Sequence, residues 1–202
     1  MIKNNQTCIF KSILIDKIDV DDQLTSFSFD IPVDSLKKSI EELGIIHPVT
    51  LTQVDNRFRI ICGHKRIQIF SQLKINKIPA IILRPAPSEE SMMMLNLSEN
   101  QFCHYYSDIE KGAILSKLYA VKIPEIRIIE KYMPMLDLEK SKKLLSDYLS
   151  ANELTTGLKT LLHEMNVPLR VYSIFSNWDV ESSDAAEIFF SVLRPGVNKW
   201  RD

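Results

Sequence analysis

Apolar residues change their spacing along the chain. Up to about residue 104, short β-branched runs alternate with stretches in which apolar residues recur at helical intervals. From residue 105 onward, nearly every stretch has helical spacing. The first kind of run is typical of buried strands, and recurrence at i, i+4 and i+7 is typical of amphipathic helices. The sequence therefore predicts an α+β fold: a domain over residues 1–104 with a small mixed sheet, then an all-α domain over residues 105–202.

The first half divides into strands and helices separated by turn-forming residues. Asp55-Asn56 lies between two strands, and Gly63 ends the second of them. Gly44 is placed to end a helix that Asp34 can cap. Strands are expected at residues 10–18, 49–52, 58–61 and 78–83, and helices at residues 34–43, 67–73 and 88–100.

Helix starts in the second half carry capping residues. Ser107 and Glu110 form a capping box, in which each side chain binds the other residue's backbone N–H. Pro124 suits the first turn of the next helix, and Asp137 can cap a helix that runs through Leu149. Further helices are expected at residues 153–165, 168–175 and 184–193.

Composition narrows the class of protein. Of the 202 residues, 45% are hydrophobic and 25% charged, which excludes a disordered chain and a disulfide scaffold. No uncharged apolar run reaches the roughly 18 residues of a membrane span, so no membrane partner is expected. Residues 1–6 lack the apolar stretch of a signal peptide, and the three cysteines form no CxxC pair. Both features favour free thiols in the cytoplasm.

Charge is balanced in both halves of the chain. The 25 basic and 26 acidic residues divide into 12 and 12 over residues 1–104 and 13 and 14 over residues 105–202. Neither half is a basic domain. Any contact with nucleic acid must therefore come from a local patch rather than from overall charge.

A strand-to-helix turn supplies the first candidate site. Gly63 permits close backbone approach, and the helix that follows presents N–H groups and a positive dipole end. His64, Lys65 and Arg66 follow, and an arginine can bind phosphate oxygens through two parallel hydrogen bonds. These features predict an anion site for phosphates. The alternative is an ordinary turn with solvated Lys65 and Arg66.

Glu99-Asn100, at the end of an expected helix, supplies the second candidate site. Adjacent carboxylate and amide oxygens can hold a hard cation such as Mg²⁺ beside a phosphate. The alternative is a plain helix end with Asn100 as its cap.

Four stretches in register resemble the N-terminal domain of ParB-type partition proteins, within the ParB/sulfiredoxin-like superfamily. That family reads as a helix ending in G-(L/I)-x-Q-P, a strand running into G-E-R-R, a V-P-V strand, and E-N-x-x-R. Order and spacing match over about 70 residues. The stretches are residues 36–49 (LKKSIEELGIIHPV), 58–66 (FRIICGHKR), 78–82 (IPAII) and 99–100 (EN).

The resemblance implies a nucleotide site with CTP and Mg²⁺ as its ligands. By position, Gly63, His64, Lys65 and Arg66 would contact phosphates. Glu99 and Asn100 would serve metal and phosphate, with Glu99 the hydrolytic residue. Three positions depart from the family: His64 replaces its glutamate, His47 its glutamine, and Cys103 the arginine of the last motif, which removes one phosphate clamp.

The same superfamily includes sulfiredoxin, whose phosphate and thiol loop reads G-C-H-R. Aligning its arginine with Arg66 puts His64 where the sulfiredoxin cysteine lies. Cys62 comes two residues too early. A reactive thiol needs an exposed, electropositive setting, so Cys62 is interpreted as a buried cysteine at a strand end.

The helical half resembles the middle region of partition proteins, which contains a helix-turn-helix. Residues 123–132 would be the scaffold helix, and the helix opening at 140–143 the recognition helix. Recognition helices offer N-terminal side chains to the major groove, so Lys140, Lys142 and Lys143 are the expected DNA contacts. Their alternative is a solvated helix face. The resemblance implies two partners, duplex DNA and a second copy of the chain in a homodimer. It also implies association with the nucleoid.

Three functions remain open at this stage. The first is a ParB-like DNA-associated protein, in partition or regulation, with a nucleotide pocket and at most weak CTP hydrolysis. The second is a small-molecule kinase or phosphotransferase of the same superfamily. The third is a degenerate ParB-fold interaction module without nucleotide turnover, which the loss of the arginine at Cys103 favours over full turnover.

Overall fold

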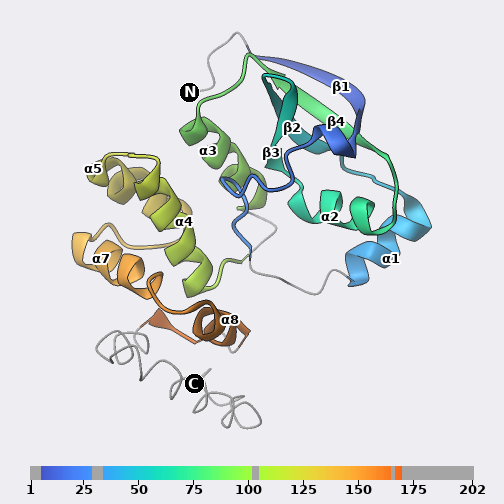
Figure 1. The fold of residues 1–202 in the computed structure, drawn as a ribbon. Coiled ribbons are helices and arrows are strands. Elements are labelled where there is room, and N and C mark those ends of the chain that lie inside the picture. Colours follow the sequence, from blue (N-terminus) through green and yellow to red (C-terminus); the bar gives the residue numbers. More distant parts are fainter. Residues whose placement is uncertain (1–5, 29–33, 102–104, 165–166, 170–202) are drawn as a thin grey trace. The chain divides into compact units, whose positions relative to one another are not determined.

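The computed structural model describes residues 6–28, 34–101, 105–164 and 167–169. The chain forms two compact units, Met1–Ser26 with Asp30–Cys103 and Phe27–Phe29 with His104–Asp202, here called the N-terminal unit and the helical unit (Figure 1). Cys103, the helix expected at 184–193 and all but the start of the helix expected at 168–175 lie outside the described residues. No helix in the described ranges is long and apolar enough to cross a membrane.

A four-stranded mixed sheet forms the centre of the N-terminal unit. Its strands follow the order β1-β4-β2-β3. β1 is antiparallel to β4, β2 is antiparallel to β3, and β2 is parallel to β4. The α+β class predicted from the sequence is confirmed. The strands are β1 (Thr7–Leu14), β2 (Val49–Val54), β3 (Arg57–Cys62) and β4 (Lys77–Arg84).

The β2–β3 hairpin forms where the sequence predicted it. Asp55 takes a left-handed conformation with φ 51°, which short polar side chains tolerate better than most. Val54 and Arg57 form the last pair of the ladder before the turn. The ladder keeps this register from Val54–Arg57 to Leu51–Ile60 and then shifts by one residue, so that Thr50 pairs with Cys62 at the end of β3.

The first strand was predicted too late in the chain. β1 ends at Leu14, opposite Lys77 where β4 begins, and a short 3₁₀ turn, η1 (Ile15–Lys17), follows. Ile18 then forms an isolated bridge with Phe58 of β3. β1 is an edge strand with both faces largely exposed, so its residues lack the alternation that marks strand boundaries.

Three helices cover the two faces of the sheet (Figure 1). They are α1 (Asp34–Leu43), α2 (His64–Gln72) and α3 (Glu89–Asn100). Successive strand residues face opposite sides, so Ile60 enters the core with α1 and α2 while Ile61 packs with Met92 of α3. Gly44 ends α1 as expected, with φ 73° and its N–H bound to the Ile40 carbonyl.

The helical unit is built on α4 (Asp108–Ala120). The predicted capping box is present, with Ser107 and Glu110 each accepting the other's backbone N–H. α4 packs against α7 (Lys142–Ala151), and a Cβ at Gly112 would lie 2.9 Å from the Tyr148 carbonyl oxygen. Glycine at this point permits close approach of the two helix backbones.

The segment between α4 and α7 corrects two expectations. Pro124 precedes the helix as its cap, and α5 (Glu125–Arg127), the π-helical turn η2 (Ile128–Tyr132) and α6 (Met133–Met135) follow in succession. Proline lacks the N–H for an i−4 bond, so the π turn accommodates Pro134 within the run. Asp137 does not cap the next helix. It is left-handed, φ 55°, in a closing turn after α6.

Ser141 takes the capping role predicted for Asp137. Its Oγ accepts the Leu144 N–H, and α7 starts at Lys142. The last described helix, α8 (Thr156–Glu164), also starts later than the predicted residue 153, because Thr155 accepts the Leu158 N–H instead.

Candidate functional site

Gly63 shapes the first candidate site at the end of β3. Its φ of 102° lies in the left-handed region, and α2 begins at the next residue. A Cβ here would lie 2.7 Å from Val49 Cγ1 on the neighbouring strand β2. Only glycine fits both the conformation and the space. The strand therefore turns at once into α2, whose first turn carries His64, Lys65 and Arg66.

Arg66 brings together three of the sequence stretches. Its Nη1 donates to the His47 carbonyl and, at 2.8 Å, to the Pro48 carbonyl. Its Nη2 lies 3.6 Å from Glu99 Oε1. The guanidinium thus joins the segment before β2, the start of α2 and the end of α3. The two candidate sites that lie apart in the sequence therefore meet at this side chain.

Cys62 lies beneath this contact. The residue is buried at the last position of β3. Burial raises the pKa of the Cys62 thiol well above its usual range, and the hydrogen bond to the Glu99 carboxylate raises it further. The nearby Arg66 charge opposes both effects only in part. The burial at the end of β3 confirms the predicted buried cysteine, and the raised pKa favours the protonated thiol over a thiolate nucleophile.

Asn100 points to a residue that the sequence analysis missed. Its Nδ2 donates to the Oδ1 and to the backbone carbonyl of Asn96, both at 2.9 Å. Asn96 is buried and donates through its own Nδ2 to the Ile61 carbonyl at 2.7 Å. The sequence did contain one indication of this role for Asn96. An asparagine among methionines and leucines, one helical turn before Asn100, is unusual on a buried helix face.

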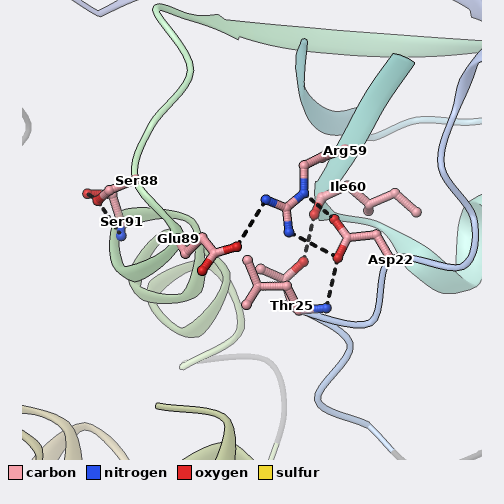
Figure 2. A network of polar contacts seen from close by, with 8 residues as sticks. Asp22, Thr25, Arg59, Ile60, Ser88, Glu89 and Ser91 are labelled. Atoms are coloured by element: carbon pink, nitrogen blue, oxygen red, sulfur yellow. Dashed lines mark hydrogen bonds and ion pairs between the residues drawn. The ribbon is translucent and has the colours of Figure 1, made fainter. Parts of the chain in front are cut away.

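A charged network on β3 was also missed (Figure 2). Arg59 Nε donates to Asp22 Oδ2 at 2.6 Å and Nη2 to Oδ1 at 3.2 Å, while Nη1 lies 3.3 Å from Glu89 Oε1. Thr25 Oγ1 donates to the Ile60 carbonyl at 2.7 Å. The network fastens both the loop after η1 and the start of α3 to β3.

The network changes the acidity of its members. Burial alone would raise the pKa of Asp22. The Arg59 hydrogen bonds, the Leu24 N–H and the positive charges of Arg59 and His64 outweigh burial, so the pKa falls below its usual value. The Asp22 hydrogen bonds in turn raise the pKa of Arg59.

Whether the site can bind Mg²⁺ depends on the oxygen atoms of Glu99 and Asn100. Among the described residues, no three His, Cys, Asp or Glu side chains form a metal-binding group. Mg²⁺ commonly takes only one or two carboxylates and obtains its other ligands from water and nucleotide phosphates. The Glu99 side chain is about half exposed, and the Asn100 oxygen is the amide atom not bound to Asn96. The pair therefore fits a cation held jointly with a bound phosphate.

The three predicted DNA contacts lie in the helical unit. Lys142 and Lys143 occupy the first turn of α7, and Lys140 precedes its cap. Lys140 Nζ lies 2.6 Å from Glu130 Oε2, and Lys142 Nζ 3.0 Å from Glu125 Oε1. All three lysines are exposed. Exposed ion pairs contribute little energy, so these pairings can exchange for other anions.

Comparison with known proteins identifies the fold around this site. Residues 2–101 match the family model of the ParB N-terminal domain, which ends one residue after Asn100. Residues 2–101 belong to the ParB N-terminal domain family. Its similarity to a solved Pnob8-like ParB-N domain, at 18% identity and a TM-score of 0.50, covers 94% of this chain and 82% of that one and supports the same fold.

The chain is also similar to two curated proteins that are named as probable chromosome-partitioning proteins ParB. The chain is 28% identical over 142 residues to a probable chromosome-partitioning protein ParB of Borreliella burgdorferi, covering 65% of this chain and 55% of the relative. It is 25% identical over 157 residues to the corresponding protein of Coxiella burnetii, covering 77% and 52%. The chain thus spans about half the length of these two ParB proteins.

Proposed function

We propose that this chain is a ParB-like, DNA-associated protein whose N-terminal unit binds a nucleoside triphosphate, with CTP the expected ligand. The observation that carries the proposal is the position of Arg66. Its guanidinium contacts the Pro48 carbonyl at 2.8 Å and faces Glu99 at 3.6 Å. Residues that resemble separate phosphate motifs in sequence therefore lie side by side.

The phosphates would lie at the start of α2. Gly63 lets a ligand approach the backbone, and the N-terminal end of α2 favours an anion through its dipole and N–H groups. Lys65 would contribute a point charge, and His64 would add a donor where the family has glutamate. Arg66 would hold the loop and bind phosphate with the guanidinium edge that now faces Glu99.

Glu99 and Asn100 would complete the site with Mg²⁺. When bound, the cation would neutralise phosphate charge and polarise the phosphoryl group. Arg66 Nη2 lies 3.6 Å from Glu99 Oε1 and forms an ion pair with this carboxylate. A phosphate that took over Arg66 would release this carboxylate to the cation or to an attacking water, which makes Glu99 the residue for any slow hydrolysis.

The helical unit would supply the DNA contacts. In this proposal the α5–α6 run is the scaffold and α7 the recognition helix, capped by Ser141. Lys142 and Lys143 in its first turn, with Lys140 before it, would meet phosphates. The net charge of −1 predicts weak binding by a single copy, so a homodimer on DNA is the expected assembly.

Calorimetry with CTP, ATP and GTP tests the proposal, each with Mg²⁺ and with or without random duplex DNA. Selective binding of CTP is expected. Selective binding of ATP together with phosphate transfer to a small molecule would instead support the phosphotransferase alternative. Absence of binding to every nucleotide under both conditions would contradict the nucleotide site and leave a ParB-fold interaction module.

A further inference from the structure

We infer that Asn96 is a positioning residue that makes Asn100 present its amide oxygen, and not its NH₂ group, to the ligand. The inference rests on the proposed nucleotide site. In that site the Asn100 oxygen would bind the cation or accept a hydrogen bond from the ligand. Asn100 then makes no direct phosphate contact, because a phosphate oxygen accepts hydrogen bonds and an amide oxygen cannot donate one.

The orientation of Asn96 is set by a backbone group. Its Nδ2 lies 2.7 Å from the Ile61 carbonyl, and that oxygen can only accept a hydrogen bond. The other end of the Asn96 amide is therefore the oxygen. Nδ2 of Asn100 lies 2.9 Å from this oxygen, as required for a donor meeting an acceptor.

The chain of bonds continues to the free end of Asn100. Its NH₂ group meets both Asn96 Oδ1 and the Asn96 backbone carbonyl. A primary amide has one NH₂ group, so the oxygen lies on the side away from Asn96. The Ile61 carbonyl therefore sets the donor-to-acceptor direction of the two hydrogen bonds that join Ile61, Asn96 and Asn100, here called the relay. Ile61 lies two residues before Gly63, where the phosphates would bind.

Burial makes the relay rigid. Asn96 is 4% exposed, and both bonds replace contacts with water. Removing the Asn96 side chain would leave the buried Ile61 carbonyl without its present donor, and the Asn100 NH₂ group with the Asn96 backbone carbonyl as its remaining partner. Asn96 also lies on α3 one turn before Glu99, so the same bonds fix the end of the helix that carries both Glu99 and Asn100.

Thr25 provides a matched control for a purely structural role. Its Oγ1 donates to the Ile60 carbonyl at 2.7 Å, and the residue is 1% exposed. Ile60 and Ile61 are neighbours on β3, so Thr25→Val and Asn96→Ala each remove one buried hydrogen bond to the same strand. Only Asn96 is also bonded to Asn100.

The experiment compares CTP affinity with Mg²⁺ and with EDTA in Asn96→Ala, Asn96→Asp and Thr25→Val, after each variant is shown by circular dichroism to be folded at the assay temperature. Loss of a supporting partner behind a metal ligand commonly costs roughly 10–100-fold. We expect Asn96→Ala to lose the Mg²⁺-dependent gain by about tenfold and Thr25→Val to keep it.

Asn96→Asp separates positioning from stability. An aspartate cannot donate to the Ile61 carbonyl, but it still accepts from Asn100. The inference expects this variant to retain the Mg²⁺-dependent gain. Equal loss in Asn96→Ala and Asn96→Asp, or equal loss in Asn96→Ala and Thr25→Val, would overturn it.

A spectroscopic readout keeps the inference testable if the wild type binds no nucleotide. In that event the nucleotide proposal fails, and the side-chain NH₂ signals of Asn100 are followed by NMR instead. Slow hydrogen exchange of this group in wild type, Thr25→Val and Asn96→Asp, with faster exchange in Asn96→Ala, where the bond to the backbone carbonyl of residue 96 remains, supports the orientation. Fast exchange in the wild type rejects it independently of any ligand.

Discussion

Arg66 and Glu99 lie 3.6 Å apart, measured from Nη2 to Oε1, although they belong to different helices. The first turn of α2 and the last turn of α3 meet there because α2 follows directly from β3 and α3 packs against β3. Gly63 turns β3 directly into α2, and Asn96 ties α3 to the Ile61 carbonyl. A positive and a negative group thus face each other where a phosphate and its cation are proposed to bind.

Replacing Arg66 tests whether this contact belongs to a nucleotide site. Arg66→Ala should lower CTP affinity roughly 10–100-fold, because charge-assisted hydrogen bonds are worth about 1.5–3 kcal/mol. Arg57→Ala is the control, since Arg57 also binds a backbone carbonyl, that of Ile18 at 3.0 Å, but at the far end of β3. Calorimetry that finds equal affinities in the two variants would remove Arg66 from the site.

Gly63→Ala should destabilise the fold by roughly 2–4 kcal/mol. A left-handed residue with a Cβ costs about 1–2 kcal/mol, and the contact with Val49 at 2.7 Å adds an overpacking cost of similar size. Gly44→Ala isolates the first effect, because Gly44 has φ 73° but nothing within 4 Å of its Cβ position. Urea unfolding should therefore show a larger loss for Gly63→Ala. Equal losses would mean that Val49 moves aside without cost.

Local sequence patterns predicted the turns and helix caps, because these features depend on residues that are neighbours in the chain. The Asp55-Asn56 turn, the Gly63 break and the capping box at Ser107 were all read correctly, because each involves residues within a few positions. Asp137 was misread for the same kind of reason. An aspartate between two helical patterns suits both a helix start and a left-handed residue after a helix, and local sequence does not distinguish them.

Long-range polar contacts could not be predicted from the sequence. The Asn96–Ile61 bond spans 35 positions and the Arg59–Asp22 pair spans 37. Their formation depends on strand order and on the side of the sheet that α3 covers. Only the family resemblance suggested that Arg66 and Glu99 serve one site, because motif order carries information that periodicity lacks.

Asp22 should make stability fall in acid. Its pKa in the folded protein lies below the usual 3.8, so the unfolded chain takes up the proton first. The contribution of the ionised side chain is complete above about pH 4 and is lost as pH falls through the folded pKa. Melting temperatures of wild type and Asp22→Asn should therefore converge as pH is lowered below 4. Arg59→Ala should abolish the same pH dependence, and a constant difference at all pH values would contradict the pairing.

Lys122→Gly should stabilise the helical unit by up to about 1 kcal/mol. Lys122 has φ 60° at the end of α4, and its N–H binds the Tyr119 carbonyl in a turn that usually carries glycine. Glycine removes the steric cost of a Cβ in this conformation. Lys143→Gly, inside α7, is the matched substitution and should instead destabilise, because glycine is a poor helix former. Thermal unfolding that gives both variants the same sign would contradict the left-handed assignment.

The lysines of α7 should control DNA affinity through salt dependence if this helix meets DNA. Each phosphate contact that is lost lowers the slope of log K against log salt by about 0.9. Lys142→Ala with Lys143→Ala should therefore reduce the slope by up to about 1.8 and weaken binding to duplexes of any sequence to a similar degree. Lys38→Ala is the control, because Lys38 is an exposed lysine with a carboxylate 3.9 Å away, but on α1 of the N-terminal unit. Fluorescence anisotropy over a salt series measures both slopes. An unchanged slope in the double variant, with DNA binding intact, would place the DNA surface away from α7 and leave the Glu125–Lys142 pair as an ordinary surface contact.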